Sequence, residues 1–178
     1  PDRHTDPGTT FDANLERYVN EARAKGATPI LMSPVARRSF YNVVDTVTED
    51  EALRNVAYGD EKINSDTLVD THGKYRLSAA NVAHRLNVAY VDANAITTRI
   101  EQQYGIQGSR YLHMWLKPGE CSAIPNGRKD NTHYNIYGAR VVAGALADAI
   151  GDVVPELKPY VRHYDSVVST QGRGNHLT

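Results

Sequence analysis

The chain of 178 residues is poor in cysteine, in long apolar runs and in net charge, and each of these absences excludes a class of protein. A single cysteine, Cys121, excludes an internal disulfide and any metal site built from several cysteines. Apolar runs are short, and none approaches the roughly 20 residues that cross a bilayer. Twenty basic against 21 acidic residues give a net charge of −1. We therefore expect no membrane span and no nucleic-acid partner.

Motifs that hold metals, cofactors or phosphates are also missing. The seven histidines are scattered, without the H-E-x-x-H spacing of a zinc site, and no G-x-G-x-x-G loop is present. Cys121 lies in a loop rich in Gly and Pro (117–128), with no helix N-terminus that would lower its pKa. We expect no metal and no cofactor.

What the sequence does contain is an alternation of helical and strand-like segments. Apolar residues recur at helical spacing or form short runs, and Gly or Pro closes most segments. The predicted helices are 9–26, 74–86, 93–104 and 137–150, and the predicted strands are 27–34 and 87–92. Thr9 with Asp12 predicts a capping box, and Gly26 a helix C-cap. This order is typical of an α/β fold with a parallel sheet and helices on its faces.

Two strands are few for such a sheet, which usually has about five. The pattern favours the C-terminal part of one domain over residues 1–160, followed by a linker or the start of another domain over 161–178. Residues 41–70 hold eight acidic residues against two basic ones, a local net charge of −6. They predict a surface insertion with one short helix near 51–56. It is either a functional loop or a merely solvated one.

The string KDNTHYNIYGAR, residues 129–140, places Asp130 three residues before His133. This spacing lets a carboxylate fold back onto one imidazole nitrogen, leaving the other free to take a proton from a nucleophile. Gly138 would let the following helix pack closely beneath the loop. The other interpretation is that the two residues are an incidental surface pair.

A second pair, Asp70 and His72 in LVDTHGKY, also precedes a predicted helix. These residues are candidates for lining a substrate site, while Asp70 or Thr71 is alternatively a helix cap. No nucleophile is evident. The chain lacks a G-x-S-x-G elbow, and Ser33 precedes Pro34, which has no N–H to offer an oxyanion. We therefore expect the nucleophile to lie outside this chain.

Three strings, in order along the chain, carry a family resemblance: residues 13–40 (ANLERYVNEARAKGATPILMSPVARRSF), 70–75 (DTHGKY) and 125–139 (PNGRKDNTHYNIYGA). They resemble the SGNH (GDSL-like) hydrolases, and within them the rhamnogalacturonan acetylesterase branch. The resemblance implies a three-layer α/β/α fold with a parallel sheet. It also implies that His133 is the general base and Asp130 its orienting carboxylate. The family's Ser, Gly and Asn residues belong to upstream blocks that have no match here.

The resemblance implies a carbohydrate esterase that removes acetyl groups from a pectic polysaccharide, met in the periplasm or outside the cell. Asp70, His72 and Tyr134 are the predicted substrate-binding residues, and Tyr137, His113 and Trp115 favour a sugar over a lipid. We expect the chain alone to be inactive without its missing N-terminal part. A non-catalytic binding module and a general SGNH lipid or thioester hydrolase remain alternatives.

The tail YDSVVSTQGRGNHLT, residues 164–178, is similar to the opening strand and turn of bacterial pectinesterase domains. This second resemblance implies a pectinesterase domain in the same polypeptide. An ordinary C-terminal extension is the alternative. Both resemblances point to pectin as the polymer.

Overall fold

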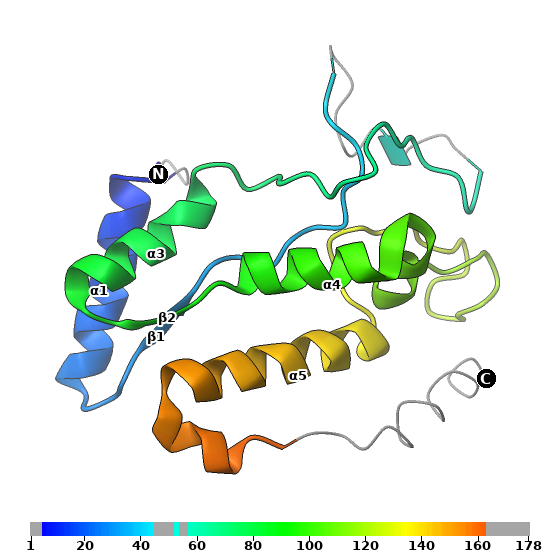
Figure 1. Cartoon of the computed structure of the whole chain (residues 1–178). Helices are drawn as coiled ribbons and strands as arrows, with labels where there is room; N and C mark the ends of the chain where they lie inside the picture. Colours follow the sequence, from blue (N-terminus) through cyan, green and yellow to red (C-terminus); the bar gives the residue numbers. More distant parts are fainter. Residues whose placement is uncertain (1–4, 45–51, 54–56, 163–178) are drawn as a thin grey trace. The chain divides into compact units, whose positions relative to one another are not determined.

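A computed structural model describes residues 5–44, 52–53 and 57–162 (Figure 1). The tail that resembles a pectinesterase lies outside them, as does most of the short helix predicted near 51–56, of which residues 52–53 are helical. The described residues form two compact units. Unit 1 contains residues 5–36, 72–97 and 146–161, and unit 2 contains 37–44, 52–53, 57–71, 98–145 and 162.

Unit 1 is built on two short parallel strands. Strand β1, Ile30–Met32, pairs with β2, Ala89–Val91, with Ile30 opposite Ala89 (Figure 1). Both strands were predicted, and both are shorter than the sequence pattern suggested. Parallel neighbours need a long crossover connection, usually through a helix. The chain between the two strands includes α3, Tyr75–Leu86, so the predicted α/β architecture is confirmed.

Helix α1, Thr10–Ala24, lies beside α3, and Val19 and Val82 are buried within this unit. Gly26 adopts φ +77°, and its N–H donates to the Arg23 carbonyl, which confirms the predicted C-cap. The predicted capping box is wrong in its partners. The Asp12 carboxylate accepts the N–H of Gly8 at 2.9 Å, and the Thr9 side chain makes no cap bond.

The remaining helices are α4, Ala93–Gly108, α5, Ile136–Val153, and the 3₁₀ segments η1, Ser109–Leu112, and η2, Pro155–Tyr160. Gly105 interrupts α4 at φ +71° and ψ 178°, the position where the sequence predicted the helix to end. Asp92 begins α4 by accepting the Ala95 N–H at 2.9 Å. The buried hydroxyl of Ser33 donates to the same carboxylate and accepts the Asn94 N–H.

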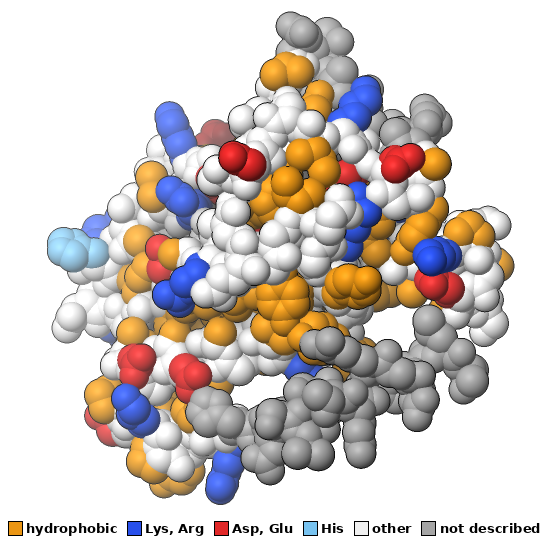
Figure 2. Space-filling model, turned by 45° about the vertical axis from the view of Figure 1, so that its right-hand side comes forward, with side chains coloured by type: hydrophobic (Ala, Val, Ile, Leu, Met, Phe, Trp, Pro, Cys, Tyr) orange, Lys and Arg blue, Asp and Glu red, His pale blue; other side chains and the backbone are white. Residues whose placement is uncertain are grey.

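Apolar side chains also reach the surface. On the face shown in Figure 2, hydrophobic side chains lie exposed among the charged ones. The large ones with more than half of their area exposed are Tyr18, Val43, Leu77, Tyr111, Ile136 and Tyr160. None of the helices that the structure describes has both the length and the apolar character needed to cross a membrane.

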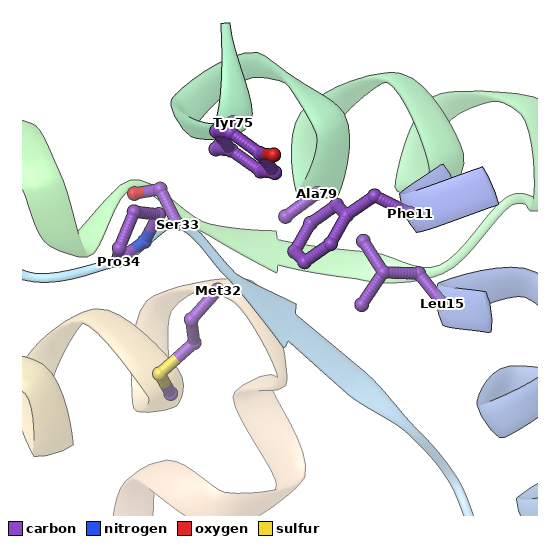
Figure 3. Close-up of a pocket in the computed structure, with 7 residues that line it drawn as sticks. All are labelled: Phe11, Leu15, Met32, Ser33, Pro34, Tyr75 and Ala79. Carbon is purple, nitrogen blue, oxygen red and sulfur yellow. The ribbon is translucent and has the colours of Figure 1, made fainter. Parts of the chain in front are cut away.

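Unit 1 also contains a pocket of about 280 Å³ at the carboxyl end of β1 (Figure 3). Side chains of α1, α3 and β1 surround it, and most of them are apolar. The lining residues are Phe11, Leu15, Met32, Ser33, Pro34, Tyr75 and Ala79. The one aliphatic hydroxyl, that of Ser33, is already hydrogen-bonded to Asp92.

Candidate functional site

The segment that carries Asp130 and His133 belongs to unit 2, and backbone bonds hold both of its ends. Arg128 pairs with Leu116 through two hydrogen bonds of 2.8 Å. At the other end the Met114 N–H donates to the His133 carbonyl at 3.0 Å. The loop between is therefore fixed at its base even though it contains no regular secondary structure.

The Asp130 carboxylate accepts hydrogen bonds from several neighbouring donors. Its Oδ1 accepts the N–H groups of Thr132 and His133, at 2.7 and 2.9 Å. Its Oδ2 lies 2.8 Å from His133 Nδ1 and 3.0 Å from Arg128 Nη2. An Asp that accepts from the backbone two and three residues ahead forms a local turn, and this turn brings the ring of His133 back to the carboxylate. The predicted contact between Asp130 and His133 is thus confirmed.

The charge state of Asp130 fixes the tautomer of His133. Burial raises the pKa of Asp130, but the hydrogen bonds from the backbone N–H groups of His133 and Thr132, and then from the His133 ring, outweigh it. The pKa therefore lies below its usual value, and the carboxylate is ionised at neutral pH. An ionised carboxylate only accepts, so Nδ1 of His133 carries the proton. In the neutral ring Nε2 is then an acceptor, which is the state that a general base requires.

The two side chains differ in exposure. The carboxylate of Asp130 is 10% exposed, whereas the ring of His133 is 68% exposed. The carboxylate is thus held by the protein while the ring is open to a reactant. This arrangement can position an imidazole and stabilise the imidazolium that forms when Nε2 takes a proton.

Asn135 connects the loop to α5. Its side-chain oxygen accepts the Gly138 N–H at 2.9 Å, which caps the first turn of the helix. Its amide nitrogen donates to the carbonyls of Tyr111 and His113, at 2.8 and 2.9 Å. Gly138 approaches Leu112 so closely that a β-carbon would lie 2.0 Å from the Leu112 oxygen. The predicted close packing at Gly138 is confirmed.

Between the two residues of the pair lies Asn131, which the sequence did not single out. It is buried and contacts Arg38 and Trp115 through side-chain hydrogen bonds of 2.9 Å each. Arg38 in turn binds Glu61, from the acidic stretch. The sequence separations of 93 and 23 residues leave no local signal for either contact.

The aromatic residues that favoured a sugar in the sequence lie in unit 2, and their role toward a sugar stays a prediction. His113 and Trp115 are buried, at 1% and 9% exposure, because both pack inside unit 2. His113 Nε2 lies 2.7 Å from a carboxylate oxygen of Glu101, which is also buried. Tyr134 is partly buried, and its ring lies against that of His113, with the centroids 4.7 Å apart and the planes tilted by 35°. Tyr137 shares a hydrogen bond of 2.6 Å with the hydroxyl of Tyr104.

The Asp70 and His72 pair straddles the boundary of the two units. Asp70 is an exposed residue of unit 2, and His72 is a partly buried residue of unit 1. The alternative that Asp70 or Thr71 caps α3 is wrong, because Lys74 is the N-cap residue and no side chain caps the helix. The substrate-binding role of Asp70, His72 and Tyr134 stays a prediction.

Among the described residues, no serine hydroxyl is hydrogen-bonded to the ring of His133. Ser109 is buried, and its hydroxyl accepts from Arg38 Nε at 2.8 Å. The Ser33 hydroxyl binds Asp92. Cys121 is a free, partly exposed thiol. In the same part of the chain, no three His, Cys, Asp or Glu side chains are grouped so that they could hold a metal ion.

Two curated relatives match this chain. Rhamnogalacturonan acetylesterase RhgT of Bacillus subtilis (strain 168) is 31% identical over 171 residues, which are 96% of this chain and 62% of that protein. Probable rhamnogalacturonan acetylesterase YesY of the same organism is 48% identical over 44 residues, 25% of this chain and 20% of that protein. No family model matches, and no solved structure matches with statistical significance.

The parallel pairing of β1 and β2 gives an α/β fold, and the relationship to RhgT supports a fold of the SGNH-hydrolase class. Within that class the chain is a relative of the rhamnogalacturonan acetylesterases. It spans 62% of the length of the longer match.

Proposed function

We propose that this chain is part of a carbohydrate esterase that removes acetyl groups from a pectic polysaccharide of the rhamnogalacturonan type. The observation that carries the proposal is the 2.8 Å contact between His133 Nδ1 and the ionised carboxylate of Asp130. The names of the two relatives support the substrate class. Asp70, His72 and Tyr134 are the proposed contacts to the sugar.

The proposed reaction follows the logic of a Ser-His-Asp triad. A serine hydroxyl attacks the acetyl carbonyl while Nε2 of His133 takes its proton, and the protonated ring then returns that proton to the leaving sugar oxygen. Asp130 holds Nδ1–H and stabilises the imidazolium. Water, deprotonated by the same nitrogen, releases acetate from the acyl-enzyme. In this reaction scheme the nucleophile, the base and the acid of the acylation step are all protein side chains.

The serine and the donors that stabilise the oxyanion are proposed to belong to an upstream part of the same domain. Two observations support this. Among the described residues, no serine hydroxyl of unit 2 is hydrogen-bonded to His133, and the match covers 62% of the longer relative. We further propose a periplasmic or extracellular location, because a pectic polymer is met there, and a pectinesterase domain in the same polypeptide.

The test compares the 178-residue chain with the natural polypeptide that includes the upstream residues. Acetate release from acetylated rhamnogalacturonan and turnover of an aryl acetate are measured for each. We expect no turnover by the chain alone and clear turnover by the longer polypeptide. His133→Ala should lower kcat of the latter by about 10²–10⁴-fold, the usual contribution of acid–base catalysis.

His84→Ala is the matched control, because His84 is an exposed histidine of α3 in the other unit. Turnover by the chain alone that is lost with His133 would place the nucleophile within these residues. Full activity of the His133→Ala polypeptide would end the proposed role of the pair. A longer polypeptide that binds the polysaccharide without any turnover would favour the non-catalytic binding module instead.

A further inference from the structure

Asn131 is fixed on both its backbone and its side chain. Its carbonyl accepts the Arg38 N–H at 2.9 Å, and its Oδ1 accepts both Arg38 Nη1 and Trp115 Nε1, each at 2.9 Å. The peptide group that carries this carbonyl also carries the N–H of Thr132. Because a peptide group is planar, holding the carbonyl oxygen sets the direction of that N–H, which donates to Asp130 at 2.7 Å.

Arg38 uses every donor of its guanidinium. Nε donates to Ser109 Oγ at 2.8 Å, and Nη1 donates to Glu61 and Asn131 at 2.8 and 2.9 Å. Nη2 donates to Glu61 at 2.6 Å and to the Ile106 carbonyl. The side chain is fully buried, so each of these five contacts replaces water. A planar fork of five donors makes this set possible, and a lysine ammonium cannot reproduce it.

Glu61 keeps the guanidinium in this orientation. Its two oxygens bind Arg38 side by side, and Arg110 approaches the same carboxylate at 3.0 Å. The Glu61 side chain is 5% exposed. The ring of Trp115 lies against both cations. Its centroid is 4.5 Å from Cζ of Arg110 and 5.5 Å from Cζ of Arg38. Buried charges need such partners, and removing one leaves the others uncompensated.

We propose that Arg38 is a positioning residue for the Asp130 and His133 pair, acting through Asn131, and that Glu61 holds Arg38 in place. This inference rests on the proposed function, because it gives a catalytic pair its geometry. Arg38 does not touch the reacting atoms. Through Glu61, the acidic stretch contributes one carboxylate to this cluster.

The first measurement uses the 178-residue chain and needs no activity. The ring nitrogens of His133, labelled with ¹⁵N, report which nitrogen carries the proton. The unmodified chain should show one tautomer, with the proton on Nδ1. Arg38→Lys keeps a cation beside Glu61 but loses the contact from Nη1 to Asn131 Oδ1, and Asn131→Ala removes Oδ1 itself. In both variants the carbonyl of residue 131 is then held only by the backbone N–H of residue 38. Both variants should show a mixture of the two tautomers.

Tyr137→Phe is the control. It removes a hydrogen bond of 2.6 Å within unit 2 but touches neither Arg38 nor Asn131, so the single tautomer should persist. In the longer polypeptide, Arg38→Lys and Asn131→Ala should lower kcat roughly 10–100-fold, with KM changed less than about twofold, as expected for misplaced catalytic groups.

A single Nδ1–H tautomer in both Arg38→Lys and Asn131→Ala would overturn the inference. If one variant fails to fold, as judged by its amide spectrum, the other decides. If both fail while Tyr137→Phe folds, the cluster maintains the fold rather than the pair, and the inference is wrong. Failure of the proposed function has a different signature, namely a mixed tautomer in these variants with no esterase turnover in the longer polypeptide.

Discussion

At Gly138 the backbone of α5 passes so close to η1 that no side chain fits. An added β-carbon would meet the oxygen, the carbon and the α-carbon of Leu112 at 2.0, 2.7 and 2.8 Å. All three are backbone atoms, which cannot rotate away as a side chain would. The approach is part of the site, because Asn135, which caps this turn, also binds the carbonyls on either side of Leu112.

Gly138→Ala should therefore destabilise unit 2. Relief of the overlap requires a shift of backbone, and overpacking of this kind costs about 1–3 kcal/mol or more. Gly144→Ala, in the same helix, is the control, because a β-carbon there has no neighbour within 4 Å. It should stabilise by about 0.5–1 kcal/mol. Urea denaturation measures both, and equal effects at the two positions would contradict the close approach.

At the scale of elements, the acidic stretch is not uniformly solvated. Asp60 and Asp66 are exposed, as a surface insertion predicts, but Ala52 is buried and the side chain of Glu61 is only 5% exposed. Burial raises the pKa of Glu61, yet the hydrogen bond and charge of Arg38, followed by those of Arg110, outweigh it and leave the pKa lowered. The Glu61 carboxylate thus reaches the interior of unit 2, while backbone bonds such as Val69 N–H to the Ser39 carbonyl hold other parts of the stretch.

The lowered pKa of Glu61 predicts how stability depends on pH. A carboxyl group whose pKa is depressed on folding stabilises the protein above its unfolded pKa, near 4.5, and this stabilisation is lost as the pH falls through the folded value. The free energy of unfolding should therefore decrease as the pH is lowered below about 5.

Glu61→Gln should flatten this acid dependence and lower stability at neutral pH by about 3–5 kcal/mol, because it leaves two buried or partly buried cations with less compensation. Chemical denaturation at several pH values measures both effects. Glu156→Gln, in exposed η2, is the control and should change little. If the free energy of unfolding of Glu61→Gln falls below about pH 5 as steeply as that of the unmodified chain, other carboxyl groups cause the pH dependence.

The elements that the sequence predicted well are those with local causes. The helices α1 and α3 follow from apolar spacing, and Gly26 closes α1. The contact between Asp130 and His133 follows from their three-residue separation. The cluster of Arg38, Glu61 and Asn131 has no such cause, because its members come together only in the folded unit.

For the same reason the sequence did not indicate that His113 and Trp115 are buried. An aromatic residue in an irregular segment has no periodicity that assigns it to the interior or to the surface. Their burial depends on Glu101, Arg38 and Arg110, which lie on other segments.

At the scale of the whole molecule, the sheet of unit 1 has two strands in the part that the structure describes. Strand β1 pairs with β2 along one edge, and its three residues are all partly exposed. Its other edge has no strand partner among those residues. An uncovered edge offers N–H and C=O groups to another chain.

We expect the 178-residue chain to self-associate as its concentration rises, which sedimentation velocity measures. Leu31→Lys introduces a charge on β1 and should shift the distribution toward monomer, because charged edge strands resist pairing. Leu77→Lys, at a site of α3 that is already half exposed, should leave association unchanged. A chain that stays monomeric at every concentration would show that the β1 edge does not recruit a partner.

Trp115 is the single tryptophan of the chain, and it lies against Arg38 and Arg110 and hydrogen-bonds to Asn131. The tryptophan fluorescence of the protein therefore originates at one known place. Its emission should respond to the electric field of two neighbouring cations and to loss of the indole hydrogen bond. The molecule thus carries a built-in optical reporter beside Asp130 and His133, and a spectral change will locate an event there without an added label.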